Sequence, residues 1–140
     1  MEAFISFFYN FATMDDNYFK SESPKKDSGF IWALVGLLLF SLMGIGIDYD
    51  EFSQHLSKDI SIPSWYFYLI FIINSLIVSA ILLIYFYKKI GVLLYPLATG
   101  AHFISHMYYL DTFLYSDVSA LFVFVGIGLL AIIPKWQFFK

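Results

Sequence analysis

The chain contains no cysteine and no arginine among its 140 residues. Without cysteine it can form no disulfide, thiolate metal site, iron–sulfur cluster or palmitoyl anchor, and it has no thiol nucleophile. Without arginine it lacks the planar side chain that holds phosphate and carboxylate groups through two parallel hydrogen bonds. The basic residues are all lysines and form no basic patch, so we expect no nucleic-acid partner.

Charged residues are also scarce, at 14%, whereas 60% of the residues are hydrophobic and 22% are aromatic. This balance lies far from that of soluble domains and is typical of membrane proteins. The expected fold class is an all-α membrane protein, namely an up-down bundle of four transmembrane helices with an N-terminal amphipathic interfacial helix. The expected spans cover residues 30–47, 65–87, 90–110 and 116–133.

Residues 1–29 are expected to form a cytoplasmic interfacial helix and a linker, and residues 30–140 the transmembrane domain. Phe4, Phe8 and Phe11 fall near one helical face, which suits a helix lying at the headgroups. The alternative is a loosely ordered tail that packs on the bundle or on a partner. No cleavable signal peptide is visible, so the first span is expected to act as an uncleaved signal anchor.

The lysines predict how the chain is oriented. If the N-terminus is cytoplasmic, every lysine except Lys58 lies on the inner side, as the positive-inside rule requires. We therefore expect an integral protein of the bacterial inner membrane with both termini in the cytoplasm. The loop expected after the first span is then external, as is the loop expected after the third span. Acidic residues of these two loops are expected to attract cations to an outer mouth: Asp48, Asp50, Glu51 and Asp111.

The third expected span carries a polar stripe along one helical face. Tyr95, Thr99, His102 and His106 follow one another at steps of four, three and four residues. Counting outward from the short Lys88-Lys89 turn places part of the second span at the depth of His102. The expected polar cluster therefore comprises His102, His106, Thr99, Tyr95, Asn74 and Ser75.

Two histidines at positions i and i+4 of a helix can share one metal ion. No cofactor is predicted, and a divalent metal ion or Cu(I) bound by His102 and His106 is kept as an alternative. Further ligands would be Met43 or Met107 for Cu(I), or Asp48, Asp111 and His55 for a harder ion. The structural alternative is that the neutral imidazoles only form hydrogen bonds between helices, with Asn74 or Ser75.

The residue types that the expected spans lack exclude some functions. The sequence places no Asp or Glu deep in an expected span, which argues against ion-coupled transport through a carboxylate and against a paired-aspartate protease. Ser75 and His102 would need an orienting carboxylate to act as a nucleophile and its base, and no motif supplies one.

Three functional hypotheses remain. The leading one is a non-enzymatic accessory or self-associating subunit in the lipid bilayer, whose partner is a second copy or a larger membrane protein. The alternative is a metal-binding, metal-transporting or proton-conducting protein that uses the pair His102 and His106. An intramembrane enzyme comes third.

Overall fold

The computed structural model describes residues 23–58, 62–111 and 113–140 of the chain. Every regular element in this part is a helix, so the all-α class is confirmed for it. The expected N-terminal interfacial helix lies outside the described residues. The first three helices are α2 (Ser28–Lys58), α3 (Ser64–Tyr85) and α4 (Lys89–Leu110).

The rest of the chain forms one further helical rod with changing pitch, called the fourth rod below. Pro134 lies at the start of its last element, where the missing N–H of proline costs least. A π-helical turn lies at its centre, where the backbone hydrogen bonds span five residues instead of the four of an α-helix. Its segments are α5 (Tyr115–Val123), the π-helix η1 (Phe124–Gly128), α6 (Leu129–Ile132) and the 3-10 helix η2 (Ile133–Phe138).

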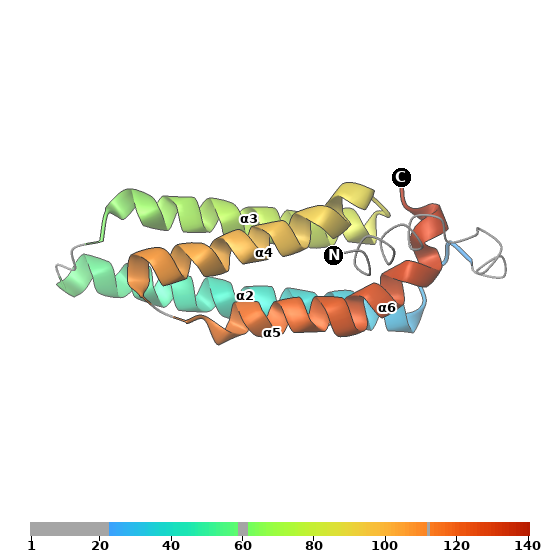
Figure 1. Cartoon of the computed structure of the whole chain (residues 1–140), viewed down its shortest axis with the longest axis horizontal. Helices are drawn as coiled ribbons and strands as arrows, with labels where there is room; N and C mark the ends of the chain where they lie inside the picture. The colour runs from blue at the N-terminus through green and yellow to red at the C-terminus, as the bar shows by residue number, and fades with distance from the viewer. Residues whose placement is uncertain (1–22, 59–61, 112) are drawn as a thin grey trace, which may run out of the picture.

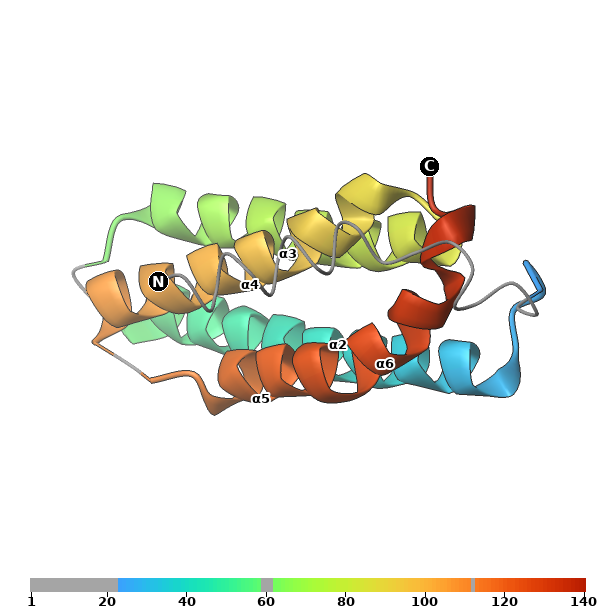
Figure 2. The same cartoon turned by 45° about the vertical axis from the view of Figure 1, so that its right-hand side comes forward.

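The three helices and the fourth rod lie side by side in alternating directions (Figure 1). We call the end where α2 and α4 finish and α3 and α5 begin the loop end. The opposite end, where α2 and α4 begin and α3 finishes, is called the lysine end. Here the last residues of the chain turn across the bundle (Figure 2), and Lys140 exchanges backbone hydrogen bonds with Tyr87 and Lys89.

Three helices of the described residues are long and apolar enough to cross a membrane: Ser28–Leu56, Ser64–Tyr85 and Tyr115–Phe138. This is the requirement for an integral membrane protein. The helix α4 is not among them, and its buried face carries the polar stripe of Tyr95, Thr99, His102 and His106. Its exposed residues include Leu93, Leu97 and Ile104, so its outer face is apolar like that of its neighbours.

The helix α2 extends well beyond the expected span. The segment expected as a loop, Asp48 to Ser64, begins with three further turns of this helix, since no glycine or proline lies between Gly46 and Pro63. The expectation that no carboxylate lies deep in a span is therefore wrong. Asp48 belongs to a helix long enough to cross a membrane, and only 1% of its surface is exposed.

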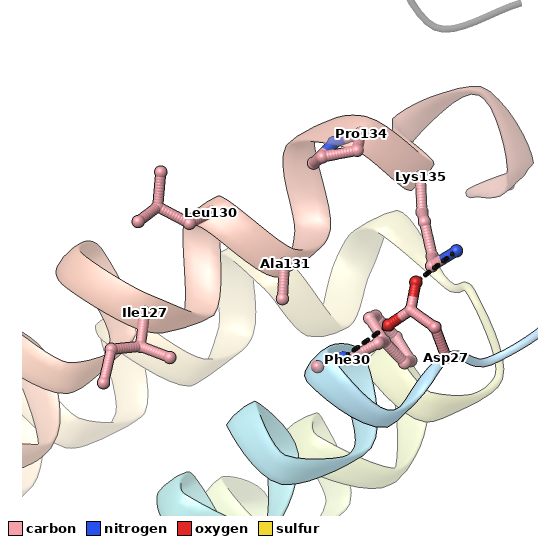
Figure 3. A pocket seen from close by; sticks show the side chains of 8 residues that line it. Asp27, Phe30, Ile127, Leu130, Ala131, Pro134 and Lys135 are labelled. Carbon is pink, nitrogen blue, oxygen red and sulfur yellow. Dashed lines mark hydrogen bonds and ion pairs between the residues drawn. The ribbon is translucent and has the colours of Figure 1, made fainter. Parts of the chain in front are cut away.

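An ion pair joins the fourth rod to the start of α2 at the lysine end. The Nζ atom of buried Lys135 lies 3.0 Å from a carboxylate oxygen of Asp27 (Figure 3). It also donates to the carbonyl oxygens of Ser23 and Lys25. Asp27 also accepts the backbone N–H of Phe30, and together these contacts hold the pKa of Asp27 below its usual value. The pair borders an open pocket of about 310 Å³ between α2 and the fourth rod.

Helices α3 and α4 approach most closely beside their short connection. A Cβ atom added to Gly91 would lie 2.7 Å from the carbonyl oxygen of Ala80 and 2.8 Å from the backbone nitrogen of Ile84. Both contacts are with backbone atoms, which cannot rotate away. Only glycine therefore permits the present spacing of the two helices at this point.

Gly91→Ala should lower the thermal unfolding midpoint of the detergent-solubilised protein, measured by tryptophan fluorescence. The expected cost is about 1–3 kcal/mol, because the added methyl group overpacks the contact between the helices. Gly100→Ala is the matched control on the same helix, since a Cβ atom there meets nothing within 4 Å. The control should be neutral or slightly stabilising. Equal loss in both variants would show that helix propensity, not the close approach, dominates.

Candidate functional site

The histidines of α4 both face the interior of the bundle. His102 and His106 are fully buried, at 0% exposure, and their ring centroids are 4.6 Å apart. The separation of four residues on an α-helix puts their side chains one above the other on the same face. Each imidazole consequently needs partners from the surrounding helices, because water does not reach it.

The carboxylate of Asp48 lies between the two imidazoles. One of its oxygens, Oδ2, is 2.8 Å from Nε2 of His102, and the other, Oδ1, is 3.0 Å from Nε2 of His106. The side-chain amide of Asn74 on α3 donates to Oδ2. The buried Oδ1 accepts no hydrogen bond of good geometry. Nε2 of His102 thus bonds to Oδ2, whereas Nε2 of His106 lies beside Oδ1, which still has free acceptor capacity.

Three further side chains complete this group. Asp117 of α5 places Oδ2 2.7 Å from Nδ1 of His102. The hydroxyl oxygen of Tyr66 on α3 lies 3.4 Å from Nδ1 of His106, and Glu51 of α2 places Oε2 3.1 Å from Nε2 of the same histidine. We call the whole group the Asp48 cluster: Asp48, Glu51, Tyr66, Asn74, His102, His106 and Asp117.

Proton positions in the Asp48 cluster are constrained by its acceptors. An ionised carboxylate only accepts hydrogen bonds, and a neutral imidazole donates from one nitrogen alone. Both nitrogens of His102 face carboxylates, so two protons must lie between it and the pair Asp48 and Asp117, or a cation must take the place of one. The cluster is therefore built to hold positive charge.

Burial increases the cost of leaving the carboxylates of the Asp48 cluster without positive charge or hydrogen-bond donors. Asp48 and the two histidines are each at most 1% exposed, and Asp117 is only 5% exposed. A buried carboxylate without a cationic or donating partner costs several kcal/mol. Glu51 differs, because 25% of its side chain is exposed. It is thus the one ionisable member of the cluster with substantial access to solvent.

No protein-family model, curated protein or solved structure matches the chain. Its function must therefore be argued from the Asp48 cluster itself. Within the described residues, the ligand atoms of Asp48, His102 and His106 lie within 4.8 Å of one another, as a shared metal ion would require.

The structure brings together part of the polar group expected from the sequence. Asn74 joins His102 and His106 through Asp48. Thr99 is buried but donates to the carbonyl oxygen of Tyr95 in its own helix. Tyr95 is also buried, and its hydroxyl oxygen has no hydrogen-bond partner. Ser75 lies on the exposed side of α3 and donates to its own helix, at Phe71.

The four acids expected at an outer mouth take different positions. Asp48 and Glu51 lie in the Asp48 cluster, on the inward face of α2. Asp50 is exposed and accepts a hydrogen bond from Gln54 on the next turn. Asp111 is exposed and ends α4 in the left-handed conformation, with φ of 49°.

Two partners of the histidines were not expected from the sequence. Neither Tyr66 nor Asp117 belongs to the polar cluster or to the outer mouth that the sequence predicts. A depth argument applied to the connection between α4 and α5 would have placed Asp117 near the loop end, but it does not pair Asp117 with His102, which lies further from that connection along the chain. The same argument at the start of α3 would have placed Tyr66 near the loop end.

Asp48→Ala should destabilise the metal-free protein by about 3–5 kcal/mol, because it leaves two buried imidazoles and an amide without their shared acceptor. Asp50→Ala removes the same side chain from the exposed face of the same helix and should change the free energy of unfolding by less than about 0.5 kcal/mol. Thermal unfolding midpoints in one detergent compare the two. Similar midpoints would refute a stabilising role for the carboxylate of Asp48.

Proposed function

We propose that this protein is a membrane metal-binding protein that holds one divalent ion of the zinc class within its helices. The ligands are Nε2 of His102, Nε2 of His106 and the carboxylate of Asp48, with Glu51 as the fourth. The observation that carries the proposal is the convergence of three buried ligand atoms within 4.8 Å. Two histidines with carboxylates form a ligand set typical of Zn²⁺ sites.

The spacing of the ligand atoms supports this proposal. Zinc binds nitrogen and oxygen at about 2.0–2.2 Å, so tetrahedral ligand atoms lie about 3.3 Å apart. The distances from the Nε2 atoms to Asp48 are 2.8 and 3.0 Å, and that from His106 to Glu51 is 3.1 Å. The two Asp48 distances are to different oxygens, and the ligand atoms of Asp48, His102 and His106 all lie within 4.8 Å of one another, so small side-chain movements would accommodate the ion.

The outer contacts of the histidines support it as well. Metal-bound histidines usually hold their second ring nitrogen through a carboxylate, a carbonyl or water. Asp117 stands at that position on His102, and the hydroxyl group of Tyr66 stands there on His106. Asn74 in turn orients Asp48. These contacts turn both Nε2 atoms toward the acids of α2, with Nε2 of His102 bonded to Asp48 and Nε2 of His106 bonded to Glu51.

The ligand chemistry favours a borderline dication over Cu(I). A Cu(I) site would draw on the soft sulfur atoms of Met43 or Met107. Met43 is 58% exposed and Met107 is 48% exposed, so both side chains face away from the Asp48 cluster. Nitrogen and carboxylate oxygen are the donors that remain.

The proposal includes four membrane spans, with α4 as the third and the fourth rod as the last. The apolar outer face of α4 supports this, since its polar residues are turned inward. Lysines from the start of α2, the α3–α4 connection and η2 gather at the lysine end, which favours cytoplasmic termini. Residence in a bacterial inner membrane stays a prediction.

Proton binding is the second candidate, and one observation favours it. His102 lies between two carboxylates, Asp48 and Asp117, at distances typical of charge-assisted hydrogen bonds. The same residues could therefore store or relay protons without a metal. The expectations of an accessory or self-associating subunit and of an intramembrane enzyme also stay predictions, and a metal-holding subunit is compatible with the first.

The purified wild-type protein, loaded with Zn²⁺ in detergent and desalted, should retain about one ion per chain by elemental analysis. The double variant His102→Gln/His106→Gln should retain none, because it removes both nitrogen ligands. His55→Gln removes the other histidine of the chain and is the matched control, expected to retain the ion.

Unfolding gives an independent readout of the same binding. Zinc at a hundred times its dissociation constant should stabilise the wild type by about 2.7 kcal/mol and leave the double variant unchanged. A wild type that retains no metal and gains no stability would refute the metal proposal and leave proton binding. Retention by the double variant would place the ion elsewhere.

A further inference from the structure

The Asp48 cluster is not equally far from the two ends of the bundle. From Lys89, where α4 begins, to His102 is about 20 Å of helix, whereas His106 is one turn, or about 6 Å, from the end of α4 at Leu110. The loop end is therefore the nearer exit for anything bound between the histidines.

The path toward the lysine end leads into the apolar core. Buried Thr99 lies one turn below His102, and one turn further buried Tyr95 stacks on Phe124 of the fourth rod, with ring centroids 5.0 Å apart. From there to the lysine end the core contains further apolar side chains that are at most 2% exposed: Phe30, Leu37, Ile84 and Ile132. A hydrated ion has no polar route through such a core.

The lysine end is also covered from outside. The ring of Tyr87 packs against Phe30 at 5.4 Å and against Phe139 at 5.2 Å between centroids. The chain after Pro134 crosses this end of the bundle (Figure 2), and Lys140 is bonded to the backbone on both sides of the α3–α4 connection. The lysine end is thus closed both by the apolar core and by the C-terminal segment that covers it.

The loop end has polar side chains that lead outward along α2. Glu51 contacts His106 and is 25% exposed on its side chain. His55 follows one turn further, partly buried, with its ring stacked near Phe67 at 4.9 Å. Its Nδ1 atom is buried and has no hydrogen-bond partner, while Nε2 lies 3.5 Å from Oγ of Ser64. Asp48, Glu51 and His55 thus form a ladder of ligand groups on one face of the helix.

We propose that the metal ion enters and leaves the Asp48 cluster only at the loop end, past Glu51 and His55. The protein then holds metal for one side of the membrane and does not pass it across. This inference rests on the metal-binding function proposed above. It makes the chain a receiver or carrier of metal on the side that the loop end faces, and not a channel.

Zinc-loaded protein reconstituted in vesicles tests this sidedness. The chain lacks cysteine, so a Lys25→Cys variant labelled with a membrane-impermeant maleimide reports the fraction of molecules whose lysine end faces outward. External EDTA should remove zinc only from the remaining fraction, whose loop end faces outward. A lumenal zinc dye should show no flux above that of empty vesicles.

The outcomes separate the two proposals. Removal of all zinc by external EDTA, zinc flux into the lumen, or removal that matches the labelled fraction would each overturn one-sided access while metal binding stands. A wild type that never retains zinc would overturn both proposals.

A rate measurement tests the route itself. His55→Phe keeps an aromatic ring beside Phe67 but removes the nitrogen ligands, and should slow zinc loading about tenfold without changing the final stoichiometry. Asp50→Asn is the control, because Asp50 lies exposed on the same stretch of α2 and off the route. Equal loading rates for wild type and His55→Phe would remove His55 from the route.

Discussion

The rest of the structure depends on one carboxylate placed between two imidazoles. Asp48 reaches from α2 to both histidines of α4 and accepts the amide of Asn74 from α3. Through His102 the same group reaches Asp117 on α5. Three helices and the fourth rod thus meet in a single polar network inside the bundle. Such a network stabilises only when it is complete, which fixes the rotation and depth of each helix.

This network divides the bundle into two unlike halves. Toward the lysine end, contacts are those of an ordinary apolar core, with Phe30, Leu37 and Ile84 fully buried and Gly91 allowing α3 and α4 to approach. Toward the loop end, α2 carries acids and a histidine on its inward face. The apolar half therefore contributes packing between the helices, and the polar half contributes the groups that could hold a ligand.

The sequence predicted the half of the site that lies on one helix. The spacing of His102 and His106 identified the inward face of α4, because a period near 3.6 is visible within one segment. It named Asp48 only as one of three candidate ligands for a harder ion, because an acidic segment after an apolar run is normally interpreted as a loop. The helix continues since its last turns bury Asp48 against the histidines, and that gain comes from residues more than fifty positions away. Tertiary contacts of this kind leave no local pattern.

Charge balance bears on the metal ion proposed for the Asp48 cluster. Asp48, Glu51 and Asp117 surround two imidazoles, so with neutral rings the group carries three negative charges in a small volume of low dielectric. A single proton compensates one charge at one contact. A dication compensates two at the point where both Nε2 atoms and Asp48 converge, and it leaves the Nδ1 hydrogen of His102 to pair with Asp117. The arrangement of acids, with one on each side of His102 and a third near solvent, therefore suits a divalent ion better than protons alone.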